Sequence, residues 1–167
     1  MEGISRYGKF LKIFFQIQEK HKTRKKKKHV NQKQLKLVSG IKLHDDSINS
    51  VCWIDNNTIV TGSSDHSLKL VDVEKLEGIQ TIKTKDSITT SIDYSHNSLL
   101  TSHEDGFIRM WDFRNSNSPI LTFKSHAKLA SCLKFHKNPH IFASGAYDQT
   151  IKIWDSRSVF PLQTLST

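Results

Sequence analysis

The chain lacks the residue patterns of secreted and membrane proteins. It has only two cysteines, Cys52 and Cys132, which provide no disulfide framework and are typical of a reducing compartment. Its best apolar run, residues 10–15, is short, contains Lys12 and is followed by basic residues. This run therefore predicts neither a transmembrane helix nor a signal peptide, and we expect no membrane partner.

Motifs of catalysis and cofactor binding are also missing. There is no glycine-rich phosphate loop, no paired-carboxylate motif and no G-x-S-x-G nucleophile elbow. Cys132, His136 and His140 are evenly spaced, but Asn138-Pro139 predicts a turn before His140 and no second cysteine pair completes a zinc site. We predict a non-enzyme with no catalytic residue, metal, cofactor or small-molecule substrate.

The positive charge is concentrated in one segment. The net charge is +9, but seven of the 25 basic residues lie within residues 20–28. This basic segment is interpreted as a solvated loop, a nuclear localisation signal or a contact to RNA phosphates. No aromatic ladder accompanies it, so sequence-specific reading of a single strand is not expected. The candidate targeting or RNA-binding residues are Lys22, Arg24, Lys25, Lys26, Lys27 and Lys28.

What the sequence does contain is a repeat. Residues 63–72, 103–112 and 146–155 share one spacing, in which an aspartate precedes a small turn residue and an alternating strand. The inner aspartates, Asp65, Asp105 and Asp148, lie about 40 residues apart, which indicates stacked supersecondary units. From about Ile41 onward the hydrophobic period is two, so the prediction is all-β.

The repeat predicts four strands in each of three units. The expected strands are 48–54, 58–62, 68–73 and 80–83, then 88–94, 99–102, 107–113 and 120–123, then 130–135, 141–145, 151–154 and 162–165. Residues 7–14 match residues 147–154 position for position, which predicts one strand of an earlier unit. The expected division is 1–15 for the end of a truncated blade, 16–40 for a basic inter-blade insertion, and 41–84, 85–125 and 126–167 for three blades.

These units resemble WD repeats, and the resemblance covers nearly all of the chain outside the basic insertion. It implies a partial β-propeller of about three four-stranded antiparallel blades plus a strand from a preceding blade. In WD repeats a histidine before the first strand, a hydroxyl on the second, the turn aspartate and a tryptophan on the third form a hydrogen-bonded chain. The implied members are His126, Ser144, Asp148 and Trp154; His44, Thr61 and Asp65; and Thr101, Asp105 and Trp111.

The motif is incomplete in two units. Val71 replaces the tryptophan in the first, and Lys85 replaces the histidine in the second. Ser144, His126 and Asp148 could also be read as a hydrolase triad. The structural reading is favoured, because hydroxyl and aspartate recur in the unit that lacks the histidine.

A closer resemblance is to the Ytm-type WD-repeat ribosome biogenesis proteins. It rests on the Lys-rich insertion, the opening LHDDSINSVCW (residues 43–53), the blade without its histidine and two W-D-x-R endings. It implies a non-catalytic scaffold in pre-rRNA processing and large-subunit maturation, located in the nucleus, nucleolus and nucleoplasm. The implied partners are a Pescadillo-type complex and the pre-ribosome. That family also has a ubiquitin-like domain and earlier blades, which this sequence does not contain. Because an arc of three blades leaves one strand edge unpaired at each end, we expect either a piece of a longer protein, which we favour, or assembly with other blades in trans.

Two sets of residues are candidates for partner binding. WD-repeat proteins commonly bind partners where loops surround the narrow face, which points to Tyr147, Glu104 and Ser64 before each turn aspartate and to Ser47, Ile88 and Leu129 at the first strands. Alternatively, Arg114 and Arg157 end two consecutive W-D-x-R boxes. Such boxes resemble the adaptor contact of cullin-RING ubiquitin ligase receptors, although arginine follows the blade end in many WD repeats.

Overall fold

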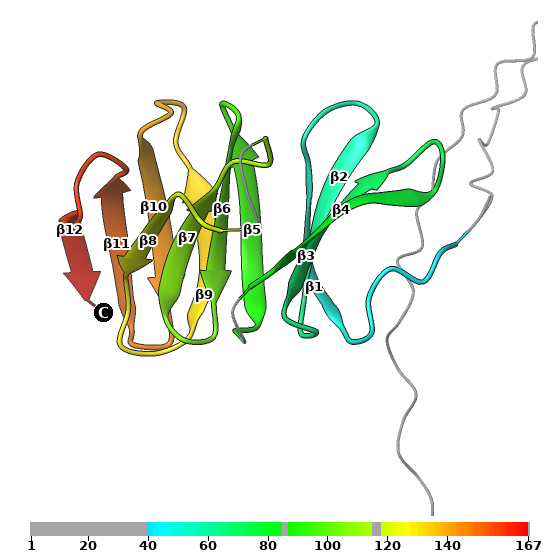
Figure 1. The fold of residues 1–167 in the computed structure, drawn as a ribbon. Coiled ribbons are helices and arrows are strands. Elements are labelled where there is room, and N and C mark those ends of the chain that lie inside the picture. Colours follow the sequence, from blue (N-terminus) through cyan, green and yellow to red (C-terminus); the bar gives the residue numbers. More distant parts are fainter. Residues whose placement is uncertain (1–39, 85–86, 115–117, 167) are drawn as a thin grey trace, which may run out of the picture.

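The computed structural model of this chain describes residues 40–84, 87–114 and 118–166. They form three four-stranded antiparallel sheets, arranged as successive blades (Figure 1). The first sheet contains β1 (Ile48–Trp53), β2 (Thr58–Ser63), β3 (Ser67–Asp72) and β4 (Glu77–Lys83). The second contains β5 (Thr89–Ser95), β6 (Ser98–His103), β7 (Phe107–Trp111) and β8 (Leu121–Lys124). The third contains β9 (Ala130–Phe135), β10 (Ile141–Ala146), β11 (Thr150–Asp155) and β12 (Pro161–Ser166).

All twelve predicted strands are confirmed, as is the all-β fold class. The largest difference is β4, which begins at Glu77 rather than Gln80 because a bulge near Gly78 lets the strand continue. None of the described residues belongs to a helix that could span a membrane. The strand predicted at residues 7–14 and the basic segment lie outside the described residues. The predicted boundaries between units therefore stay a prediction.

The turns between the second and third strands need one residue in the left-handed region. This residue is His66 in the first sheet, Gly106 in the second and Gln149 in the third, with φ between 60° and 79°. At Gly106 the requirement is strict, because a Cβ atom there would lie 2.5 Å from the carbonyl oxygen of His126. The turn of the second sheet thus lies directly against the loop that leads into the third.

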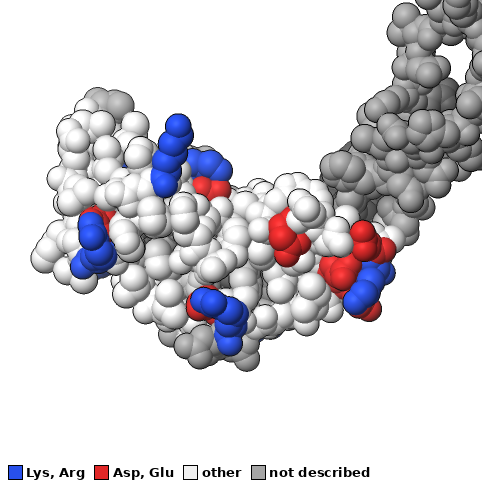
Figure 2. Space-filling model, turned by 90° about the horizontal axis from the view of Figure 1, so that it is seen from above, with Lys and Arg blue, Asp and Glu red and all other residues white. Residues whose placement is uncertain are grey.

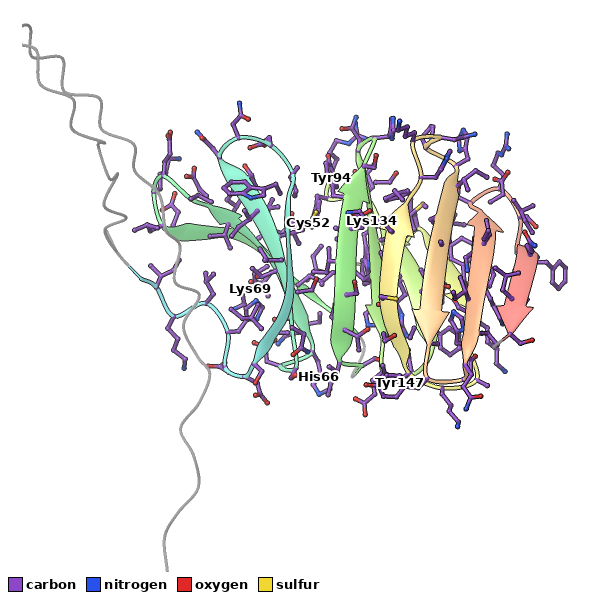
Figure 3. The ribbon with its side chains drawn as sticks, turned by 180° about the vertical axis from the view of Figure 1, so that it is seen from behind. Cys52, His66, Lys69, Tyr94, Lys134 and Tyr147 are labelled. Atoms are coloured by element: carbon purple, nitrogen blue, oxygen red, sulfur yellow. The ribbon has the colours of Figure 1, made fainter. Side chains whose placement is uncertain are left out.

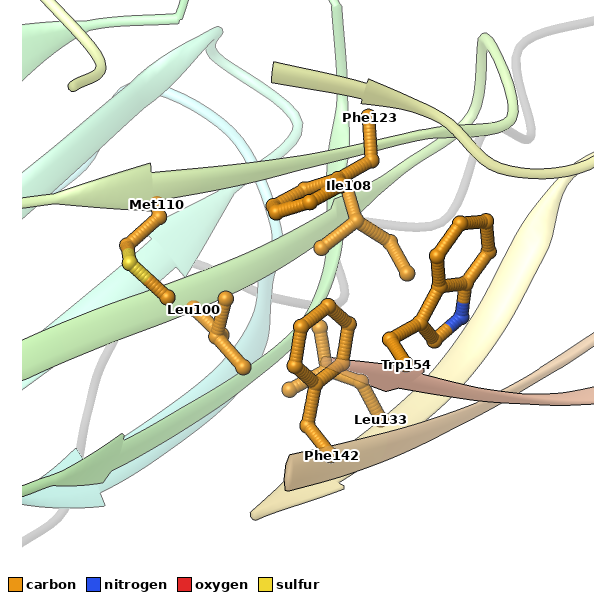
Figure 4. Packing of buried hydrophobic residues seen from close by; sticks show 7 residues of the cluster. All are labelled: Leu100, Ile108, Met110, Phe123, Leu133, Phe142 and Trp154. Atoms are coloured by element: carbon orange, nitrogen blue, oxygen red, sulfur yellow. The ribbon is translucent and has the colours of Figure 1, made fainter. Parts of the chain in front are cut away.

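Hydrophobic side chains join each sheet to the next. One buried cluster lies between the first and second sheets, and another lies between the second and third (Figure 4). In the second cluster the rings of Phe142 and Trp154 stack at 6.0 Å, with Phe123 from the preceding sheet packed beside both. Burial of these aromatic and aliphatic surfaces is the main stabilisation of the stack.

The first strands of neighbouring sheets, β1, β5 and β9, are also linked by polar groups. The Asn49 amide donates to the carbonyl of Thr89 at 2.9 Å, and the Thr90 hydroxyl donates to the carbonyl of Ala130 at 2.5 Å. Each link crosses from one sheet to the next, so the inner strands are held in a fixed order.

Candidate partner-binding face

The third sheet contains the complete hydrogen-bonded chain that the motif predicts. The indole N–H of Trp154 donates to Ser144 Oγ at 2.9 Å, and Ser144 Oγ lies 2.7 Å from His126 Nε2. His126 Nδ1 lies 3.0 Å from a carboxylate oxygen of Asp148. A neutral histidine that donates from Nδ1 accepts the serine proton at Nε2, so every donor in the chain meets an acceptor. This network holds the loop before β9 against β10 and β11.

The carboxylate of Asp148 is the most heavily hydrogen-bonded member. It also accepts the Ala127 backbone N–H at 3.0 Å and the Thr150 hydroxyl at 2.7 Å. Burial alone would raise the pKa of Asp148, but these donors together with His126 hold it well below its usual range. Burial lowers the pKa of His126, and the nearby carboxylate only partly opposes that effect. The pair therefore consists of an ionised aspartate and a neutral histidine near pH 7.

The first sheet repeats this arrangement without the tryptophan. His44 lies 2.8 Å from Asp65 through Nδ1 and 2.8 Å from Thr61 through Nε2, and Ser67 donates to Asp65 at 2.6 Å. Burial would raise the pKa of Asp65, yet the hydrogen bonds from Ser67, the Asp45 N–H and His44 lower it to about 2. The missing indole is replaced by buried Val71, which packs with Leu43 and Ile59. Thr61 keeps its contact to His44 and donates to the carbonyl of Lys69 at 3.3 Å.

The second sheet rebuilds the network from a residue that the motif does not contain. Trp111 donates to Thr101 at 2.8 Å as expected, but Thr101 bonds Nε2 of His103 at 2.7 Å. His103 lies on β6 and is fully buried. Lys85, which stands at the usual histidine position, lies outside the described residues. Sequence reasoning missed His103, and the tryptophan-hydroxyl-histidine relay is nevertheless present in this sheet.

The predicted turn aspartate of the second sheet does not join this relay. Asp105 instead forms an ion pair with Arg109 at 2.6 Å, and the Arg109 guanidinium lies over the ring of Phe107. The corresponding residues are serine and lysine in the first sheet and threonine and lysine in the third. At position 107 a phenylalanine stands where the other two sheets have a hydroxyl residue, and at position 109 an arginine stands where they have a lysine. Asp105 therefore pairs with an arginine, whereas the turn aspartates of the other sheets bond a histidine.

Backbone hydrogen bonds join the partner-binding candidates in three equivalent pairs. The N–H of Ser64 donates to the carbonyl of Ser47 at 2.9 Å. The second and third sheets repeat this bond from Glu104 to Ile88 at 3.0 Å and from Tyr147 to Leu129 at 2.9 Å. The pairs thus form a periodic row along one end of the sheets.

Tyr147 is the most prominent side chain of this row. Its side chain is 68% exposed, whereas Ser64, Ser47, Ile88 and Leu129 are half-buried. Figure 3 places Tyr147 and His66 at one end of the sheets and Tyr94 toward the opposite end. An exposed aromatic ring beside a rigid turn is the kind of residue that anchors protein interfaces.

The two W-D-x-R arginines lie at that opposite end. Arg114 forms a bidentate pair with Asp112, at 3.0 Å and 2.9 Å, and Arg157 forms the same pair with Asp155, at 2.9 Å and 2.6 Å. These pairs hold the pKa values of both aspartates below their usual range. Figure 2 views this end of the molecule and shows basic and acidic groups side by side. Each arginine thus pairs with an aspartate in a turn of its own blade, which supports a structural role for the W-D-x-R box.

The geometry does not favour the other chemistry considered. Ser144 and His126 are buried, and Ser144 Oγ already binds the Trp154 indole, so the hydroxyl is not presented to a substrate. Within the ranges that the structure describes, no three metal-ligating side chains are grouped to hold an ion. Cys132 lies on β9, while Asn138 and its neighbours turn the chain before His140.

The repeat spacing and the hydrogen-bonded chain agree with a comparison against protein families. The WD domain, G-beta repeat family matches residues 35–72, 77–112 and 117–155, which is more than half of the chain. The chain belongs to the WD-repeat family. Solved WD-repeat-like folds agree with this: a chain of the mitotic checkpoint complex superimposes with a TM-score of 0.72 at 24% identity, over 77% of this chain and 40% of that one. The computationally designed Ika4 protein gives 0.63 at 24% identity, over 72% of each.

Within this WD-repeat family, three similar sequences share one description. The "Ribosome biogenesis protein WDR12 homolog" of Drosophila mojavensis is 40% identical over 69% of this chain and 28% of its own length. The proteins of the same name from Ixodes scapularis and Nematostella vectensis are each 33% identical, over 81% and 84% of this chain. The chain thus spans about a third of the length of these curated relatives.

Proposed function

We propose that this WD-repeat chain acts as a non-catalytic scaffold in ribosome biogenesis, in pre-rRNA processing and maturation of the large subunit. The observation that carries the proposal is its 33–40% identity to relatives named for ribosome biogenesis. The buried state of Ser144 and His126 supports a structural rather than a catalytic role for them. The proposed location is the nucleus, including the nucleolus and nucleoplasm, where ribosomal subunits are assembled.

The proposed contact surface is the row of turns that contains Tyr147. The backbone bonds from Ser64, Glu104 and Tyr147 to the adjoining strands fix this row, and the buried networks lie directly behind it. A rigid surface loses little conformational entropy on binding, which favours recognition of protein partners. The proposed partners are a Pescadillo-type complex and the pre-ribosome, with residues 20–28 as a nuclear address or an RNA contact.

Affinity purification from the native cells tests this function. The intact chain is expected to recover large-subunit assembly factors, and a fraction that persists after RNase treatment would reflect protein contacts. Recovery of a cullin adaptor instead of assembly factors would contradict the proposal and favour a ubiquitin-ligase receptor. Loss of every partner after RNase treatment would contradict direct protein binding.

A pair of matched variants tests the surface itself. Tyr147 and Phe160 are aromatic residues that are 68% and 74% exposed, but Phe160 lies in the loop before β12 at the opposite end of the blade. Tyr147→Ala is expected to reduce recovered assembly factors by at least about tenfold, the effect of losing one strong anchor. Phe160→Ala is expected to leave recovery unchanged. Equal recovery with Tyr147→Ala and the unmodified chain would show that the row is not the contact surface.

A further inference from the structure

Each sheet exposes one aliphatic side chain near the start of its outer strand. The outer strands are β4, β8 and β12, which lie at the edges of the sheets opposite the linked strands β1, β5 and β9. The aliphatic residues are Ile79, Ile120 and Leu162, which are 54%, 48% and 59% exposed. The middle sheet packs against a neighbour on both faces, yet Ile120 is exposed about as much as the other two. The exposure therefore belongs to the outer edge and does not depend on which sheets lie beside it.

Irregular strand pairing explains this exposure. The register of β3 and β4 shifts at Ile79, and the register of β11 and β12 shifts at Leu162, so each is an extra residue in its strand. In the second sheet Ile120 directly precedes β8, and its N–H donates to the carbonyl of Met110 at 2.8 Å. A bulge re-aims a side chain, and it also makes the edge a poor template for pairing with another strand. The exposed side chains, rather than the backbone, are thus what this edge offers to a partner.

The turn that leads into each outer strand carries a projecting cation. The cations are Lys75, Arg114 and Arg157, whose side chains are 67–74% exposed, whereas the aspartates that pair with them are only 13–23% exposed. The positive member of each pair is therefore the one that faces solvent. Both arginines bond their aspartates through Nε and Nη2, so Nη1 lies outside the pair. One turn separates the cation from the aliphatic residue of the same sheet, which places both at the same end of the outer edge.

We propose that these six residues form a rim row that binds an extended acidic segment of a partner protein, in which aliphatic side chains accompany aspartate or glutamate. The carboxylates meet the cations, and arginine suits them because its planar donors match a carboxylate. The aliphatic side chains of the segment cover the bulge residues. Packed sheets lie about 10 Å apart and an extended chain advances about 3.3 Å per residue, so equivalent contacts recur after about three residues or more.

Nucleic acid fits the rim row less well than a polypeptide. Phosphates would meet the three cations but would leave Ile79, Ile120 and Leu162 exposed to water. The rim row also lies at the opposite end of the sheets from Tyr147. It is therefore a second surface, separate from the contact surface of the proposed function.

Fluorescence anisotropy with a labelled synthetic peptide tests the proposal on the complete chain. The probe carries three Glu-Leu pairs separated by Ser-Gly, and salt at about 0.15 M screens its attraction to the basic segment at residues 20–28. The expected Kd is on the order of 100 μM, a weak contact of small area. A Lys-Leu probe and a Glu-Ser probe of the same length are each expected to bind at least about tenfold more weakly, because each lacks one half of the contact. A mixed-sequence RNA oligonucleotide is expected not to displace the Glu-Leu probe.

Two matched pairs of variants locate the contact. Ile120→Ser is expected to weaken binding of the Glu-Leu probe at least about fivefold, whereas Val51→Ser, at a residue that is 50% exposed on the inner strand β1, is expected to leave it unchanged. Arg114→Gln is expected to weaken binding about threefold. Lys124→Gln removes the same charge at the other end of the second outer strand and is expected to have no effect. If Ile120→Ser fails to fold by circular dichroism, Leu162→Ser replaces it.

Tyr147→Ala separates the two surfaces. It is expected to leave binding of the Glu-Leu probe unchanged even where it abolishes recovery of assembly factors, so either proposal can fail without the other. Equal binding of the Glu-Ser and Glu-Leu probes would show attraction by charge alone and would overturn the rim row. Unchanged binding in both Ile120→Ser and Arg114→Gln would overturn it as well, and displacement of the probe by RNA would overturn it in favour of nucleic acid.

Discussion

The side chains of Thr101 and His103, two residues apart on β6, are joined by a 2.7 Å hydrogen bond. In the first and third sheets the same hydroxyl position is met by a histidine from the loop before the first strand, His44 or His126. Residues two apart on a strand face the same side, so a histidine at position 103 can replace the loop histidine without a change of fold. The second sheet thus contains its own relay, independent of the loop that precedes it.

This relay makes stability dependent on pH. Burial and the nearby Arg109 lower the pKa of His103 from 6.5 to about 4, so the unfolded chain binds a proton in a range where the folded chain does not. The free energy of unfolding is therefore expected to fall as the pH drops from about 6.5 to about 4, by up to about 3 kcal/mol from this residue. Urea unfolding at successive pH values measures the loss.

His103→Gln is the comparison for that measurement. The amide keeps hydrogen-bonding groups near Thr101 but does not titrate, so the variant is expected to lose less stability between pH 6.5 and pH 4 than the unmodified chain. Some pH dependence remains, since burial also lowers the pKa values of His44 and His126. Identical pH profiles for the two chains would contradict the assignment of the titration to His103.

The strands and the complete network of the third sheet could be predicted because they follow from local patterns. Period-two alternation defines the strands, and His126, Ser144, Asp148 and Trp154 occupy the four motif positions. These features depend on a few residues at fixed spacing, so one sequence suffices. The backbone bond from Tyr147 to Leu129 was not predicted, because the sequence names both residues only as candidates for partner binding.

The rewired second sheet was not predictable from the motif, because His103 stands where the other units have Ser63 and Ala146. His103 bonds Thr101 because the two side chains lie close together in the folded chain, and no single position of the motif encodes this contact. A signal was nevertheless present: His103, Phe107 and Arg109 all depart from the other two units in the sheet that lacks the loop histidine. Several departures in one unit indicate compensation rather than loss of the network.

Asp93 is expected to make one of the main polar contacts that hold the second and third sheets together. Its carboxylate is buried and accepts both the Lys134 ammonium at 2.5 Å and the Phe135 backbone N–H at 2.7 Å. Asp93→Ala leaves that N–H without its acceptor and is expected to cost about 2–4 kcal/mol of unfolding free energy. Lys134→Met is expected to cost about 1 kcal/mol or less, because the Lys134 side chain is largely exposed. Equal losses in urea unfolding would contradict this difference.

Ser144→Ala distinguishes a structural serine from a nucleophile. The substitution leaves the Trp154 indole and His126 Nε2 buried without their shared partner, and we expect a loss of about 1–3 kcal/mol. Thr164→Ala, at an exposed position, is expected to change stability by less than about 0.5 kcal/mol. Thermal unfolding measures both. Unchanged stability in Ser144→Ala, with loss of a hydrolytic activity, would favour the triad.

Two glycines provide the sharpest test of the contact between the second and third sheets. Gly106 has a φ of 79°, and a Cβ there would lie 2.5 Å and 2.8 Å from the carbonyl oxygens of His126 and Lys128. Gly106→Ala therefore adds backbone strain and forces apart the loop that carries His126, at an expected cost of about 3 kcal/mol. Gly78→Ala meets no atom within 4 Å and is expected to change stability by less than about 0.5 kcal/mol.

The close approach of Gly106 to His126 also predicts which part of the structure Gly106→Ala destabilises. A displaced His126 can no longer reach Ser144 and Asp148 together, so Gly106→Ala is expected to speed amide hydrogen exchange at Ala127 and along β9. Gly78→Ala, on the edge strand β4, is expected to leave exchange in the third sheet unchanged. Protection at Ala127 that survives Gly106→Ala would mean that the turn and the loop move independently, and the close approach of Gly106 to His126 would not be what holds the network in place.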